Sequence, residues 1–113
     1  MKIAILTRQE TMDRCTGKGC LKAFRLRLDA FKGYGPEAEL VAFTHAGGDL
    51  DHKIARLREY GVHTVHLSSC LRSGSPDYEA LAQRLSADFN VVGYTHGSPE
   101  GKKRRTCTIL KQL

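Results

Sequence analysis

The sequence has no long apolar segment. Its first apolar run, residues 3–6, is closely followed by Arg8 and is far too short for a signal peptide or a membrane span. We therefore predict a cytoplasmic protein without a membrane partner, and in that compartment thiols stay reduced. The four cysteines then indicate metal ligands, redox groups or buried apolar side chains rather than a disulfide framework.

The sequence also lacks linkers, low-complexity stretches and internal repeats. Its 113 residues therefore predict one domain, because two would each be too small for a proper core. No helix-turn-helix, finger or RNA-binding sheet signature accompanies the net charge of +6, so nucleic acid is not an expected partner. Residues 102–105 supply much of the positive charge. We place residues 1–98 in an α/β domain and residues 99–113 in a basic C-terminal tail that could pack on it.

Apolar runs and helical periodicity alternate along the chain. Short apolar runs predict strands over residues 3–6, 40–43, 62–67 and 89–94, with 109–110 as a candidate further strand. Apolar residues at three- and four-residue spacings predict helices over residues 21–31, 50–57 and 78–85. Residues 7–19 and 73–76 are polar and turn-rich and are predicted loops.

This alternation predicts an α/β fold. We expect a single small, doubly wound, mainly parallel sheet of the flavodoxin or Rossmann-like kind, with helices on both faces. The predicted strand order is 2-1-3-4. In such a sheet every strand-to-helix loop lies at the carboxyl edge, where ligands bind.

Residues capable of chemistry follow the predicted strands. Cys15 and Cys20 follow the first strand, His45 and Asp49 the second, Cys70 the third and His96 the fourth. Three cysteines at this edge favour a chemical role for it, because unreactive cysteines usually lie in cores. We therefore predict that the carboxyl edge of the sheet is the working site.

The types of side chain at this edge suit a metal ion. Thiolate sulfur and imidazole nitrogen form a zinc-type ligand set, and four ligands complete a tetrahedron. The Cys15–Cys20 loop also precedes a predicted helix, whose N-terminal N–H groups favour thiolate. Zinc is the predicted cofactor, and a small anionic ligand is an alternative partner. The predicted metal ligands are Cys15, Cys20, Cys70, His96 and His45.

The same loop supports a second hypothesis, a thiol-dependent reductase or phosphatase-like enzyme with Cys15 as nucleophile and Cys20 as resolving thiol. Its spacing resembles the anion-binding loop of low-molecular-weight tyrosine phosphatases and related arsenate reductases. That loop requires an arginine six positions after the nucleophile, where this chain has Leu21. A third interpretation is a ligand-binding or assembly domain whose cysteines perform no chemistry.

Other polar residues are interpreted structurally. His63 and His66 lie on opposite faces of the third predicted strand and are expected to be packed histidines. Asp49 is first a helix cap and only second a ligand. Cys107 becomes a site residue only if the tail folds back.

Several short motifs, in their order and spacing, resemble the CGGC-domain family. Residues 11–23 and 30–35 resemble the opening of that domain, and residues 39–48 align with the segment that gives it its name. Residues 67–70 resemble its Ala-Ser-Cys strand end, and residues 93–96 its closing Thr-His. The resemblance runs from about Lys2 to His96. It implies a small α/β domain of unknown activity whose cysteines and histidines bind zinc.

The chain departs from the family pattern at its cysteines. The namesake Cys-Gly-Gly-Cys is Ala-Gly-Gly-Asp at residues 46–49, and Arg8 replaces an early family cysteine. A Pro-Cys-Pro-His segment expected after Cys70 is missing from residues 73–79. The chain is therefore identified as a divergent member that retains Cys15, Cys20, Cys70 and His96, with His45 beside the lost pair.

Overall fold

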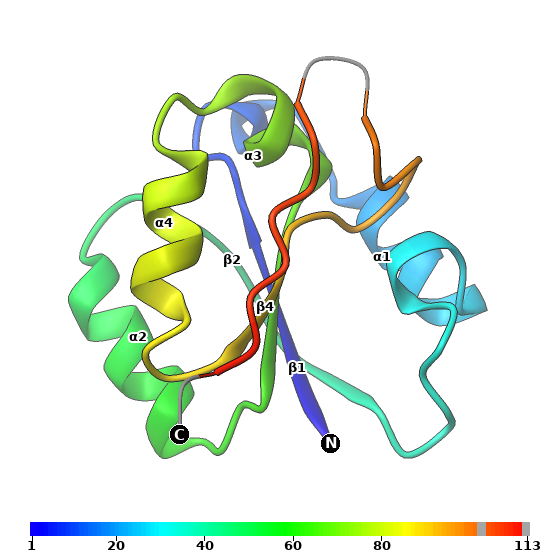
Figure 1. Cartoon of the computed structure of the whole chain (residues 1–113), viewed down its shortest axis with the longest axis horizontal. Helices are drawn as coiled ribbons and strands as arrows, with labels where there is room; N and C mark the ends of the chain where they lie inside the picture. The colour runs from blue at the N-terminus through cyan, green and yellow to red at the C-terminus, as the bar shows by residue number, and fades with distance from the viewer. Residues whose placement is uncertain (102–103, 112–113) are drawn as a thin grey trace.

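A computed structural model of the chain describes residues 1–101 and 104–111. Four strands form one sheet in the order β2-β1-β3-β4, and all three neighbouring pairs are parallel (Figure 1). The strands are β1 (Lys2–Thr7), β2 (Glu39–His45), β3 (Thr64–Leu67) and β4 (Asn90–Val92). The predicted α/β fold and strand order are confirmed.

Helices cover both faces of the sheet, as predicted (Figure 1). On one side lies α1 (Lys18–Leu26), and on the other lie α2 (Leu50–Glu59) and α4 (Tyr78–Leu85). A short α3 (Ser69–Gly74) follows β3 directly, and two 3-10 turns, η1 (Thr11–Asp13) and η2 (Asp29–Phe31), flank α1.

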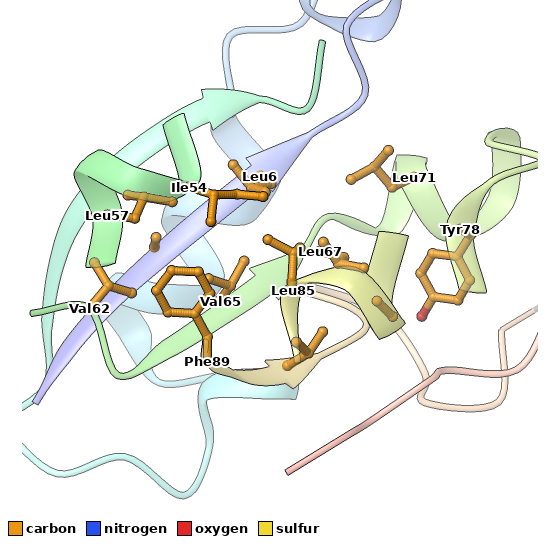
Figure 2. Packing of buried hydrophobic residues seen from close by; sticks show 13 residues of the cluster. Leu6, Ile54, Leu57, Val62, Val65, Leu67, Leu71, Tyr78, Leu85 and Phe89 are labelled. Atoms are coloured by element: carbon orange, nitrogen blue, oxygen red, sulfur yellow. The ribbon is translucent and has the colours of Figure 1, made fainter. Parts of the chain in front are cut away.

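The central strand β1 divides the core in two. Ile3 and Ile5 pack toward α1, whereas Ala4 and Leu6 belong to the larger cluster under α2 and α4. All four side chains are fully buried, which explains why β1 is a continuous apolar run rather than an alternating one. Figure 2 shows the larger cluster, where Leu6 lies among side chains from α2, β3 and α4.

The predicted helix over residues 21–31 is wrong in its second half, because α1 ends at Leu26. Arg27 adopts a left-handed conformation with φ of 55°, and Leu28 N–H bonds the Ala23 carbonyl at 2.8 Å, a Schellman-type ending. The Arg27 guanidinium also donates to the carbonyls of Phe24 and Ala38, at 2.6 and 3.1 Å. Phe31 still reaches the core, but it does so from η2, so the apolar spacing continues across a break in the helix.

The helix α3 was not predicted, and its end overlaps the loop expected over residues 73–76. Ser68 caps it by accepting a hydrogen bond from Leu71 N–H at 3.4 Å, and Leu71 is buried. Six residues are too few for an apolar periodicity to show. The strands predicted over 62–67 and 89–94 are also shorter than expected. Val62 N–H bonds Leu57 O at the end of α2, and Gly93 O accepts from the Tyr78 hydroxyl.

The chain after β4 returns to the sheet. Ile109 and Val91 exchange backbone hydrogen bonds of 2.9 and 2.8 Å in a single antiparallel bridge, in place of the strand predicted at 109–110. Lys102 and Lys103 of the basic run lie outside the described residues, and the division into a domain and a tail stays a prediction. No helix in the described part of the chain combines the length and apolarity needed to span a bilayer.

Candidate functional site

Thr95 joins three elements at the carboxyl edge of the sheet. It follows β4, and its side chain is fully buried. Its Oγ1 lies 3.1 Å from the Sγ of Cys20 in α1 and accepts a hydrogen bond from the N–H of Ser69 in α3 at 3.4 Å. The loops after β1, β3 and β4 therefore meet around one hydroxyl, as the parallel topology predicts.

His96 is held at the same place. Ser69 Oγ donates to the His96 carbonyl at 2.5 Å and accepts from the His96 N–H at 3.3 Å. The imidazole lies over the first turn of α1, since a Cβ at Gly19 would come within 3.0 Å of His96 Nε2. Glycine at position 19 thus lets the imidazole pack against the backbone beside Cys20.

Cys20 interacts electrostatically with two other cysteines. Burial raises the pKa of the Cys20 thiol, and the hydrogen bond to Thr95 partly opposes this. Negative charge on Cys70 or on Cys15 raises the pKa of Cys20 further, so both of these thiols lie within electrostatic reach of Cys20. All three are free thiols.

The other two thiols have polar neighbours of their own. Cys15 is exposed, and its Sγ accepts a hydrogen bond from Gly17 N–H at 3.3 Å. Gly17 has a φ of 82° and lies against the Phe43 ring, where a Cβ would come within 2.7 Å, so the turn into α1 requires glycine. The Sγ of Cys70 lies 2.7 Å from the Ser68 hydroxyl.

His45 and Asp49 have separate roles in the loop after β2. The His45 Nδ1 accepts from Gly47 N–H at 3.0 Å, and the His45 carbonyl accepts from Lys53 Nζ at 2.7 Å. Asp49 caps α2 by accepting from His52 N–H at 3.0 Å, as predicted. Within the described residues, no hydrogen bond joins His45 to a cysteine, and its place among the metal ligands stays a prediction.

Sequence reasoning missed the organising role of Thr95 and Ser69. Each immediately precedes a predicted ligand in the loop after a strand, Ser69 before Cys70 and Thr95 before His96, so their position was the available signal. Neither side chain is a preferred zinc ligand. A hydroxyl that connects two loops can be recognised only once the positions of both loops are known.

His66 is packed, as expected, but the same prediction for His63 is wrong, because β3 begins at Thr64 and leaves His63 exposed before the strand. His66 is fully buried on β3, where its Nε2 lies 2.8 Å from the Tyr34 hydroxyl and its Nδ1 lies 3.0 Å from the Tyr94 carbonyl. Burial lowers the pKa of His66 from 6.5 to about 4, although the bond to Tyr94 acts in the opposite direction. His63 Nδ1 lies 2.7 Å from the Thr64 hydroxyl.

Comparison with known families matches residues 2–96 to the CGGC domain. The chain belongs to the CGGC-domain family. The matched range agrees with the resemblance seen in the sequence, which extends from Lys2 to His96, and it includes every element of the sheet. No curated protein and no solved structure shows significant similarity to the chain.

The side chains of this CGGC domain supply suitable donor types for zinc, but they are not arranged as a closed site. Three sulfurs and one imidazole nitrogen match the ligand chemistry of structural zinc. Within residues 1–101 and 104–111, however, no three His, Cys, Asp or Glu side chains are placed to hold a metal ion. The Sγ atoms of Cys20 and Cys70 instead lie near the hydroxyls of Thr95 and Ser68.

Proposed function

We propose that this CGGC domain binds one metal ion, zinc, at the carboxyl edge of its sheet through Cys15, Cys20, Cys70 and His96. The observation that carries the proposal is the convergence on Thr95, which brings α1, α3 and the loop after β4 together. His45 is a candidate to complete or replace one of these ligands.

The electrostatics of the thiols favour a cation. An ionised thiol at Cys70 or Cys15 opposes ionisation of Cys20. A bound divalent cation would reverse this repulsion and hold the thiols as thiolates. Because burial and the neighbouring thiols raise the pKa of Cys20, metal binding is expected to release protons and to weaken as pH falls.

Binding requires small side-chain movements in this domain. Cys20 must turn from the Thr95 hydroxyl, and Cys70 must turn from the Ser68 hydroxyl, before their sulfurs point to a common centre. The hydrogen bonds of Ser69 to Thr95 and His96 hold α3 beside the loop after β4.

The test is a zinc titration of chelator-treated, metal-free protein against a chromophoric competitor. We expect one equivalent of zinc per chain, and loss of that equivalent in Cys20→Ser and Cys70→Ser. Cys107→Ser is the matched control, since the Cys107 N–H bonds the Tyr78 hydroxyl beside α4, away from the Thr95 contacts. Absence of stoichiometric zinc in the unmodified chain, or equal loss in all three variants, would refute the proposal.

A thiol-dependent enzyme is the second candidate, and one observation favours it. Cys15 is exposed, so a substrate could reach its sulfur, which accepts the Gly17 N–H just before the start of α1. If Cys15 is a nucleophile, it should be alkylated faster than a free-thiol peptide at neutral pH in a variant whose other cysteines are serine. Alkylation at the peptide rate would exclude this candidate.

A further inference from the structure

A pocket of about 550 Å³ lies beside α3, next to the predicted metal site. Its lining residues come from α3 and from the segment after β4. The two are joined by hydrogen bonds from Arg72 to Ser98 and Thr106, and they lie side by side in Figure 1. The pocket's charged and polar lining residues are Arg72, Arg104, His96, Ser69, Ser73 and Ser98. In the described part of the chain, no Asp or Glu lines it.

Arg72 is buried in this wall without a carboxylate partner among the described residues. The side chain is only 6% exposed, yet its Nη1 bonds neutral oxygens alone: Ser98 O at 2.7 Å, Pro99 O at 3.3 Å and Thr106 Oγ1 at 2.7 Å. A buried guanidinium usually pairs with an anion.

The other two nitrogens of the Arg72 guanidinium, Nε and Nη2, can still donate hydrogen bonds. No hydrogen bond of Arg72 Nε or Nη2 is found among the described residues, where every fully buried side-chain nitrogen or oxygen has a partner. These two nitrogens therefore keep contact with solvent, and the pocket is the space that Arg72 lines.

Arg104 adds a second positive charge. Its Nη1 donates to the Ser75 carbonyl at 2.6 Å, and its Nε lies 3.9 Å from the carboxylate of Glu79, whose side chain is 65% exposed. At that distance and exposure the ion pair is weak, so the charge of Arg104 is poorly neutralised.

We propose that this pocket binds the phosphate group of a small phosphomonoester. Two arginines offer planar donor forks, a geometry that matches phosphate oxygens. The volume falls within the range of small-molecule sites and leaves room for an organic group beside the phosphate. Because the arginines provide two positive charges and the other described lining residues include no carboxylate, a dianion is the complementary charge.

This site is separate from the proposed zinc site, although His96 borders both. Its test therefore uses metal-free protein with chelator present, so that failure of one proposal leaves the other untouched. Phenyl phosphate and inorganic phosphate are titrated separately by calorimetry at constant ionic strength. We expect saturable binding of one phenyl phosphate per chain.

Two variants with exposed or half-exposed side chains test the assignment without disturbing the core. Arg104→Gln removes one donor fork, and Ser73→Asp places a negative charge in the pocket; each should weaken phenyl phosphate binding at least about tenfold. Arg56→Gln removes the same charge from the exposed end of α2 and should leave binding unchanged. Arg72→Lys, which keeps the charge and loses the fork, should also weaken binding.

Binding of inorganic phosphate with similar affinity would show that the free ion is sufficient and would support the site. Binding of the ester alone would support it and assign part of the affinity to the organic group. The proposal is overturned if neither probe binds saturably, or if Arg56→Gln weakens binding as much as Arg104→Gln.

Discussion

The Oγ1 of Thr95 lies 3.1 Å from the Sγ of Cys20, although the two residues are 75 positions apart in the chain. The contact ties the start of α1 to the loop after β4, and the N–H of Ser69 completes the junction at 3.4 Å. Thr95 also partly counteracts the rise in the Cys20 pKa that burial causes. The arrangement of the proposed metal ligands therefore depends on a side chain that is not a ligand.

Replacing Thr95 by valine should affect both stability and reactivity. We expect Thr95→Val to lower the free energy of unfolding by about 1 kcal/mol, because a buried hydrogen bond is lost. The pKa of the Cys20 thiol should rise further, so that its alkylation requires a higher pH. Urea unfolding and the pH dependence of Cys20 alkylation measure the two effects. Thr108→Val, at an exposed position, is the control, and equal behaviour of the two variants would contradict the role of Thr95.

Stability should depend on pH through His66. Because the pKa of His66 is about 4 in the folded protein and 6.5 ordinarily, the unfolded chain binds more protons between these values. The contribution of neutral His66 is therefore complete above pH 6.5 and is lost as pH falls toward 4, by about 3 kcal/mol in total.

The measurement is a series of urea unfolding curves between pH 7 and pH 5. His66→Gln should be less stable at pH 7 and should show a smaller loss on acidification, because the titrating group is gone. His52→Gln, at an exposed position on α2, should keep the full slope. An unchanged slope in His66→Gln would assign the pH dependence to other groups.

Gly93 lets the backbone around Cys107 pack closely beside the end of β4. A Cβ there would clash with the Tyr78 hydroxyl and approach the backbone N and O of Cys107 to 2.8 and 2.5 Å. Gly93→Ala should therefore displace the segment around Cys107 and destabilise the fold by roughly 1–3 kcal/mol. Trypsin cleavage at Arg105 should become faster. Gly33→Ala is the matched control, since a Cβ at Gly33 meets nothing within 4 Å; equal cleavage rates would contradict the packing argument.

Gly19 tests whether His96 belongs to the metal site. Gly19→Ala would bring a Cβ within 3.0 Å of His96 Nε2 and should push the imidazole away from α1. We expect zinc affinity to fall about tenfold, as for other changes that misorient a ligand, while urea unfolding of the metal-free protein changes little. Unaltered zinc affinity, with Gly33→Ala for comparison, would remove His96 from the ligand set.

The order of strands and helices, and the edge of the sheet on which the reactive residues lie, can be predicted from local sequence patterns. Buried parallel strands need continuous apolar runs, such as residues 3–6, and connecting helices need apolar residues at helical spacing. These local requirements specify the order of elements, and right-handed crossovers then restrict the topology. The positions of Cys15, Cys20, Cys70 and His96 after successive strands follow directly.

The contacts that these side chains make depend on the packing of the whole fold and could not be predicted in this way. The apolar spacing of α1 continues past Leu26, yet Arg27 turns the chain because its guanidinium finds carbonyl partners as far away as Ala38. In the same way, Thr95 meets Cys20, and Arg72 bonds Ser98 and Thr106. Hydrogen bonds of this kind form between residues that are far apart in the chain, so local periodicity cannot encode them, and they exist only once the helices have packed on the sheet.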